Sequence, residues 1–244
     1  MILKNVPFVR LLAVAAPLLF ATTLLAQDPA AASEPEGDSV IVEVFKYENA
    51  GLVGYIIVLM SIVAVALIIE NFISITREKL APPDLLANIE AFFNEDDFEG
   101  AAQSCESTRC YLSNVIGAGL SKRDHAFDTI QATLREMQTE ESVKLFQKIG
   151  WLSLLSALAP MMGLFGTVTG MFVTFGVIAK SGGSVSPAQL ASGIKMALIT
   201  TILGLTVAIP VSVAFYTLRN RVIRVSTEIN AISEELFERF RGKN

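Results

Sequence analysis

Three long segments that are apolar and almost free of charge constrain this chain more than any other feature. A helix needs roughly 20 consecutive apolar residues to cross the hydrocarbon core of a membrane. Gly51 to Ile69 and Trp151 to Ala179 carry no charged residue, and Pro187 to Leu218 carries only Lys195. With 52% hydrophobic residues, the chain is too apolar for an ordinary soluble domain. The sequence therefore predicts an all-α membrane protein with three transmembrane helices.

A fourth apolar run, Leu11 to Ala26, has a different character. It follows Lys4 and Arg10 and ends before the polar stretch QDPAAASEPEGDS. A short apolar run behind basic residues is typical of a secretory signal peptide, and it is too short for a comfortable span. We expect a signal peptide at 1–26 and an acidic periplasmic linker at 27–48. The alternative is an uncleaved extra helix, since Leu24 stands where a cleavage site usually has a small residue.

Basic residues next to the three apolar segments predict the orientation. They lie after the first segment, before the second and after the third: Arg77, Lys79, Lys144, Lys148, Arg219, Arg221 and Arg224. Basic flanks are usually cytoplasmic. We therefore expect a periplasmic N-terminus, a cytoplasmic C-terminus, and transmembrane helices at 49–76, 149–180 and 187–218. A cytoplasmic helical domain at 77–148, a periplasmic loop at 181–186 and a cytoplasmic C-terminal helix at 219–244 complete the prediction.

Helical periodicity continues beyond the apolar segments. PPDLLANIEAFF, DDFEGAAQSCES and CYLSNVIGAGLSKR are typical of short amphipathic helices. No helix breaker separates the periodic stretch after His125 from the second span, so one helix of about 80 Å is expected from about Ala126 to Ala179. Pro160 is a candidate kink. Apolar residues from Val222 to Phe240 extend the third span in the same way. Helices two and three should therefore extend into the cytoplasmic domain.

Polar residues within the second and third spans are the candidate site. Ser186 and Pro187 form a good helix start, and Thr201 lies about 21 Å further along the helix. Thr167 lies nearly as far from Lys180, where the second span ends on the same side of the membrane. Both threonines should therefore lie at the same depth in the membrane. Small residues surround them, namely Gly163, Gly166, Gly170, Gly193, Ala197 and Gly204. These stripes are compatible with close helix packing and with a narrow polar path for a small ion, and position alone does not decide between the two.

Several blocks resemble the ExbB/TolQ/MotA proton-channel family. ALAPMMGLFGTVTGMFVTF and GIKMALITTILGLTVAIP are similar to its second and third spans. VALIIENFISITREKLAPPDLL and DDFEGAAQSC resemble its first-span exit and cytoplasmic domain. The likeness covers roughly residues 45 to 230. Three spans with a cytoplasmic domain of this size resemble ExbB and TolQ more than the four-span MotA proteins.

The resemblance implies a function and partners. It implies a homopentameric ring in the bacterial inner membrane, around a pore that holds the single helices of two ExbD- or TolR-like partners. An aspartate of the partner carries protons there, and the ring threonines that face it match Thr167 and Thr201, with Thr200 adjacent. Such a proton channel couples the proton-motive force to mechanical work in biopolymer transport or envelope maintenance, in some systems through a TonB-like periplasm-spanning protein.

One departure from the family pattern weakens the channel interpretation. ExbB and TolQ commonly carry a glutamate in a block like GIAEAL, whereas this chain has GIKMAL, so Met196 takes that place beside Lys195. Lys195 lies about 12 Å from the helix start and is interpreted first as an interfacial anchor that snorkels to the surface, and second as a modulator of conduction. A non-conducting structural membrane scaffold is the alternative function.

Other classes of function find little support in the sequence. The net charge is −5, and no basic patch with interleaved aromatic residues indicates nucleic acid. Cys105 and Cys110, with His125 as the single histidine, are interpreted as reduced structural thiols rather than as a metal site. No pairing of a nucleophile with a base favours an enzyme, and no cofactor is expected.

Overall fold

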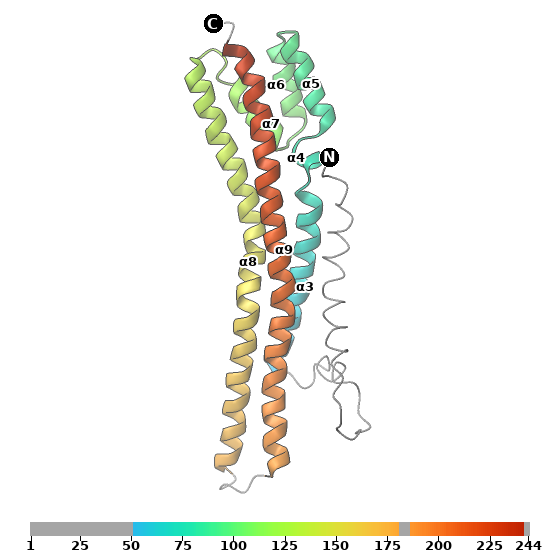
Figure 1. The fold of residues 1–244 in the computed structure, drawn as a ribbon, viewed down its shortest axis with the longest axis vertical. Coiled ribbons are helices and arrows are strands. Elements are labelled where there is room, and N and C mark those ends of the chain that lie inside the picture. Colours follow the sequence, from blue (N-terminus) through green and yellow to red (C-terminus); the bar gives the residue numbers. More distant parts are fainter. Residues whose placement is uncertain (1–50, 181–185, 242–244) are drawn as a thin grey trace. The chain divides into compact units, whose positions relative to one another are not determined.

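The computed structural model describes residues 51–180 and 186–241, with side chains described as far as Glu238. The predicted signal peptide, the acidic linker and nearly all of the predicted periplasmic loop lie outside these residues. Within them every element is a helix (Figure 1): α3 (Gly51–Ser74), α4 (Arg77–Leu80), α5 (Pro83–Asn94), α6 (Phe98–Ser107), α7 (Tyr111–Leu120), α8 (Phe127–Lys180) and α9 (Pro187–Arg241). Three of them, α3, α8 and α9, are long and apolar enough to cross a membrane. The predicted all-α architecture with three apolar helices is confirmed.

The two longest helices run without interruption through their prolines. Helix α8 has 54 residues and contains Pro160, and α9 has 55 residues and contains Pro210. Proline is tolerated within membrane helices because neighbouring groups satisfy the carbonyl it leaves free. Helix α9 begins at Pro187, and the Ser186 hydroxyl accepts a hydrogen bond from the backbone N–H of Gln189 at 3.3 Å. The continuous helix predicted from about Ala126 is confirmed as α8, and α9 starts with the Ser186 cap that the sequence predicts.

The chain divides into two compact units, and α8 and α9 contribute residues to both. The membrane unit comprises the described residues 51–68, 152–180 and 186–215. Ile57 of α3 is buried there against Ile199 and Leu203 of α9. Large apolar side chains nevertheless cover its surface, and Leu52 and Phe172 are 78% and 79% exposed. Such a surface suits a lipid solvent, in which exposed apolar groups carry no cost.

The extramembrane unit comprises the described residues 69–151 and 216–241. The three short amphipathic helices predicted from the sequence are α5, α6 and α7. Helix α5 buries Leu85, Ile89 and Phe93, each one turn apart, in a core shared with α7, α8 and α9. The Phe93 ring meets the edge of Phe237 at a centroid distance of 5.6 Å. This unit has an apolar interior, while some of its large apolar side chains, such as Ile73 and Trp151, are exposed.

Ion pairs on the extramembrane unit join helices that are distant in sequence. Glu70 pairs with Lys148 at 3.0 Å, and the same ammonium donates to the Ser74 hydroxyl at 2.8 Å. Arg77 of α4 pairs with Glu228 of α9 at 2.6 Å. Because these groups are substantially exposed, each pair contributes on the order of 0–1 kcal/mol.

Candidate functional site

The backbones of α8 and α9 touch within the membrane unit, where the two helices run side by side in opposite directions (Figure 1). A Cβ atom added to Gly204 would lie 2.6 Å from the Ala159 carbonyl oxygen. One added to Gly163 would lie 3.0 Å from the Thr200 carbonyl oxygen. Only glycine permits so close an approach of two backbones in a membrane. We call this contact the seam.

The seam continues through alternating glycines and threonines. Gly166 packs directly on the Thr200 side chain, and Gly193 on the Thr174 side chain. Between these contacts, a Cβ on Gly170 would lie 3.0 Å from the Cβ of Ala197. The six small residues that the sequence singles out therefore all lie at the seam. Their geometry favours packing as their role.

Two threonine hydroxyls of α9 meet one carbonyl of α8. Thr201 Oγ1 donates to the Gly163 carbonyl oxygen at 3.1 Å. Thr200 Oγ1 lies 3.3 Å from the same oxygen and donates to the Ala197 carbonyl at 2.7 Å. Thr200 is only 2% exposed, whereas Thr201 is partly exposed. The close approach at Gly163 thus gives both hydroxyls a hydrogen-bond partner within the protein. A polar group inside a membrane span needs such a partner, because lipid offers none.

Thr167 lies one helical turn beyond Gly163 on α8 and is partly exposed. Its hydroxyl donates to the Leu164 carbonyl of its own helix at 2.7 Å. Because Gly166 meets Thr200 and Gly163 meets Thr201, the seam register places Thr167 and Thr201 within about one turn of each other. These two threonines therefore lie close to the same level of the helix pair.

A groove of about 570 Å³ lies where the start of α3 meets α8 and α9. Its lining is mostly apolar, with polar contributions from Thr169, Thr174, Gln189, Ser192 and Thr200. Met196 also lines it, is 41% exposed, and has its Cε 3.6 Å from where a Cβ on Gly51 would lie. Neither Thr167 nor Thr201 belongs to its lining. The predicted site residues are therefore divided between two places: Thr200 and Met196 line the groove, and Thr167 and Thr201 do not.

Some residues of this region lie outside the predicted site. Thr169 and Thr174 line the groove, and each donates its hydroxyl hydrogen to a carbonyl of α8, at 2.9 Å from Phe165 O and Gly170 O respectively. Their spacing from Gly166 and Gly170 is the signal that places them on this side of α8. Lys195, next to Met196, is exposed. An exposed position near the helix start suits snorkelling.

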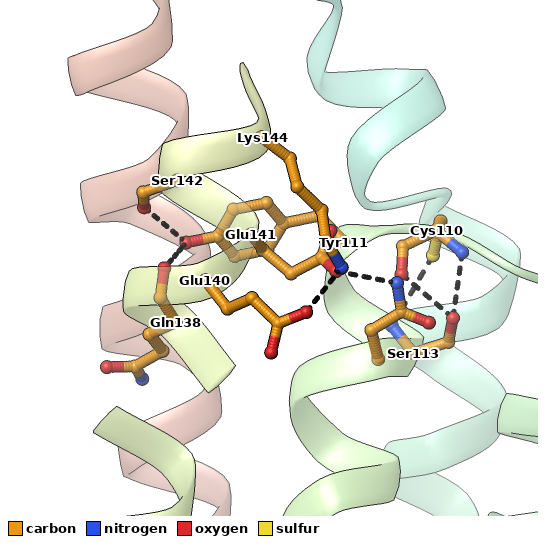
Figure 2. A network of polar contacts seen from close by, with 9 residues as sticks. Cys110, Tyr111, Ser113, Gln138, Glu140, Glu141, Ser142 and Lys144 are labelled. Carbon is orange, nitrogen blue, oxygen red and sulfur yellow. Dashed lines mark hydrogen bonds and ion pairs between the residues drawn. The ribbon is translucent and has the colours of Figure 1, made fainter. Parts of the chain in front are cut away.

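A second polar cluster lies in the extramembrane unit, and the sequence gives no indication of it (Figure 2). The buried Tyr111 hydroxyl of α7 lies 3.0 Å from the Gln138 carbonyl, 2.9 Å from Ser142 Oγ and 2.9 Å from Asn230 Oδ1. Gln138 in turn donates to Ser233 Oγ at 3.0 Å. Burial raises the pKa of Tyr111 above its ordinary value. The cluster joins α7, α8 and α9 through side chains.

An ion pair continues the cluster along α8. Lys144 Nζ lies 2.7 Å from Glu141 and 2.9 Å from Glu140, which together raise the pKa of the lysine (Figure 2). The nearly buried Glu141 also accepts a hydrogen bond from the Asn114 amide at 3.1 Å. Its charge is therefore paired and hydrogen-bonded, as a buried carboxylate requires.

The described residues offer little for metal or thiol chemistry. Cys105 and Cys110 are free, and no cluster of three or more His, Cys, Asp or Glu side chains in the described part of the chain could hold a metal ion. Burial, with a smaller contribution from the nearby Cys110, raises the pKa of the Cys105 thiol to about 11. The thiol is protonated at neutral pH, and it packs as a small apolar group.

Comparison with known proteins agrees with the arrangement of three apolar helices. The sequence model of the MotA/TolQ/ExbB proton channel family matches residues 108–231. A putative biopolymer transport protein ExbB homolog of Methanothermobacter thermautotrophicus is 26% identical over 170 residues, which are 69% of this chain and 59% of that protein.

Two bacterial relatives match as well. The biopolymer transport protein ExbB of Neisseria meningitidis serogroup A is 28% identical over 218 residues, 83% of this chain and 93% of that protein. The Tol-Pal system protein TolQ of Haemophilus influenzae is 34% identical over 110 residues, 43% of this chain and 44% of that protein. The chain thus spans less than two thirds of the archaeal relative and nearly all of the Neisseria relative.

Proposed function

This chain belongs to the MotA/TolQ/ExbB proton channel family, close to ExbB and TolQ, and we propose that it is a subunit that couples the proton-motive force to mechanical work at the cell envelope. It is a multi-pass inner-membrane protein of a family of transport-energising channels rather than of enzymes. In the proposed mechanism it forms a pentameric ring around the single helices of an ExbD- or TolR-like partner. A TonB-like periplasm-spanning protein is a further candidate component, in biopolymer transport or envelope maintenance.

The observation that carries the proposal is the position of Thr201 at the seam, with Thr167 near the same level of α8. Both are partly exposed on membrane-spanning helices, and both lie near one level of the α8/α9 pair. In the proposed mechanism they face the partner's membrane-embedded aspartate, which carries the proton. The glycines hold the two helices close enough for the Thr201 hydroxyl to bond across the seam.

A non-conducting scaffold is the second candidate, and a specific observation favours it. Met196 stands where ExbB and TolQ commonly have a glutamate. Its side chain lies in the groove beside Gly51. A thioether carries no charge, so the third span supplies no acid of its own. In this alternative the seam threonines serve packing alone.

The experiment that separates the two candidates is proton flux into vesicles that hold the full-length protein and its single-span partner. We expect flux with the parent complex and its loss when the partner's membrane aspartate is replaced by asparagine. An assembled parent complex that carries no flux under a proton-motive force would leave the scaffold as the function.

The proposed orientation has its own test. The N-terminus is placed in the periplasm and the C-terminus in the cytoplasm because basic residues such as Arg77, Lys148 and Arg219 flank the helices on one side. Reporters fused at Asn94 or after Asn244 should be cytoplasmic, and one at Gly183, outside the described residues, periplasmic. A cytoplasmic reporter at Gly183 would contradict this orientation.

A further inference from the structure

Helix α3 starts well short of the ends of the two helices that it packs against (Figure 1). Gly51 lies beside α9, since a Cβ at this position would be 3.6 Å from the Met196 Cε. From there α3 runs in the same direction as α9, because Ile57 packs on Leu203. Helix α9 begins at Pro187, about 13 Å of helix rise before Met196. It therefore extends about 13 Å past the start of α3.

Helix α8 extends past the start of α3 in the same way. Gly170 packs on Ala197, next to Met196, and α8 ends at Lys180, about 15 Å further along its axis. The groove of about 570 Å³ opens along this section, and Val177 and Leu190 belong to its lining. The described part of the membrane unit supplies no third helix there.

The chain before α3 leaves from the wall of this groove. Gly51 belongs to the lining, and its φ of +57° lies in the left-handed region that glycine adopts readily. This conformation ends α3 at Gly51, so the helix does not continue along α8 and α9. Residues 44–50, which lie outside the described residues, read VFKYENA. An extended chain of this length spans about 23 Å, enough to reach along the open section of the groove.

The side chains of this segment suit the groove. Val44, Phe45 and Tyr47 are large and apolar, and the lining of the groove is mostly apolar. Apolar side chains left in the water of the expected periplasmic linker carry a cost in proportion to their area, and burial in the groove removes it. The residues with most to gain from burial are thus the ones tethered next to the groove.

The charges at this end of the membrane unit are complementary as well. Lys180 at the end of α8 and Lys195 near the start of α9 are both exposed. The sequence contains no acidic residue at 151–180 or at 186–218. Residues 43–48, EVFKYE, carry a carboxylate at each end and one lysine between them. A segment seated in the groove brings these carboxylates towards the two lysines, which is favourable.

We infer that residues 44–50 occupy the groove, with Phe45 and Tyr47 as the side chains that fill it. The segment closes the end of the groove to lipid and ties the acidic linker to the membrane unit. This docking goes beyond the proposed function, because it requires neither a single-span partner nor proton conduction. The two can therefore fail separately.

Photocrosslinking of the full-length protein in its membrane tests the docking. With p-benzoylphenylalanine at Phe45 or at Tyr47, we expect crosslinks within the same chain to peptides of α8 or α9 that line the groove, identified by mass spectrometry. The same probe at Ser33, further back in the linker, should give none. Ser192→Trp fills the groove and should remove the crosslink. Ala191→Trp, at an exposed neighbouring position outside the lining, should keep it.

Each other outcome contradicts the docking. Crosslinks to phospholipid alone would place the segment in the bilayer and leave the groove open to lipid. Crosslinks to a second copy of the chain, read as a species of twice the mass, would make the segment part of a contact between subunits. An undiminished crosslink in Ser192→Trp, or no crosslink from either aromatic position, would show that the segment does not occupy the groove.

Discussion

The membrane unit and the extramembrane unit join the same two helices, α8 and α9, by opposite means. In the membrane unit the backbones touch at Gly163 and Gly204, and the hydroxyl of Thr201 bonds to a backbone carbonyl. In the extramembrane unit large side chains such as Leu134, Ile229 and Phe237 fill the interior, and side chains around Tyr111 bond across the helices.

The contrast follows from the solvent of each unit. In water, burial of large apolar side chains drives helices together, at about 25 cal/mol per Å² of apolar area. In lipid that driving force is absent, and close van der Waals contact and hydrogen bonds between helices replace it. Small residues therefore carry the association of α8 with α9 in the membrane unit, and large ones carry it in the extramembrane unit. A substitution that adds volume at a glycine should therefore damage the membrane unit. A substitution that removes side-chain contacts should damage the extramembrane unit.

The largest effect is expected from Gly204→Leu. Any side chain at this position meets the Ala159 carbonyl and the Gly163 backbone, and backbone atoms cannot rotate away. We expect little or no assembled complex in detergent, measured by size-exclusion chromatography. Gly176→Leu is the matched control, since a Cβ there meets nothing within 4 Å. Normal assembly of the Gly204 variant would show that the backbones need not touch.

A smaller loss is expected from Tyr111→Phe in the extramembrane unit. The substitution removes the hydroxyl that contacts Gln138, Ser142 and Asn230 and leaves their buried or partly buried groups short of a partner. We expect the free energy of unfolding to fall by about 1–3 kcal/mol. Thermal unfolding of the purified protein provides the measurement, and Tyr55→Phe, at an exposed position of α3, is the control. Equal stability of the two variants would mean that the network does not stabilise the unit.

A weaker effect, confined to high pH, is expected from Cys105. Burial raises the pKa of its thiol from an ordinary 9.0 to about 11, so the folded state keeps the proton more tightly than the unfolded state. The stabilisation is complete below pH 9.0 and is lost as the pH rises towards 11. Cys105→Ala should therefore flatten part of the fall in thermal stability over this interval. A fall of equal steepness in the alanine variant would assign it to other groups.

The smallest effect is expected from Lys195→Gln. If the lysine only snorkels to the interface, an amide can reach the same region, and proton flux should stay within a few-fold of the parent. Flux per assembled complex in vesicles is the measurement. Abolished flux, or flux raised by more than about tenfold, would instead make Lys195 part of the conduction machinery.

The sequence predicts the helices well and the polar contacts less well. Charge-free runs and the Ser186–Pro187 start predict α3, α8 and α9 because apolar length and caps are local properties. The place of Met196 in the groove, away from Thr201, depends on how three helices pack, which no local pattern states. The Tyr111 cluster joins residues from α7, α8 and α9, and such a network likewise follows only from the folded arrangement.

Proton flux through complexes that carry valine at Thr167, at Thr201 or at both tests most directly whether the seam conducts as well as packs. Valine keeps the shape of threonine, so assembly should match the parent, while loss of a hydrogen bond to the proton carrier should reduce flux about tenfold per site. Thr206→Val, with the same change on an exposed face of α9, should conduct like the parent. Full flux through the assembled double variant would contradict the account, and the threonines of the seam would then be packing residues alone.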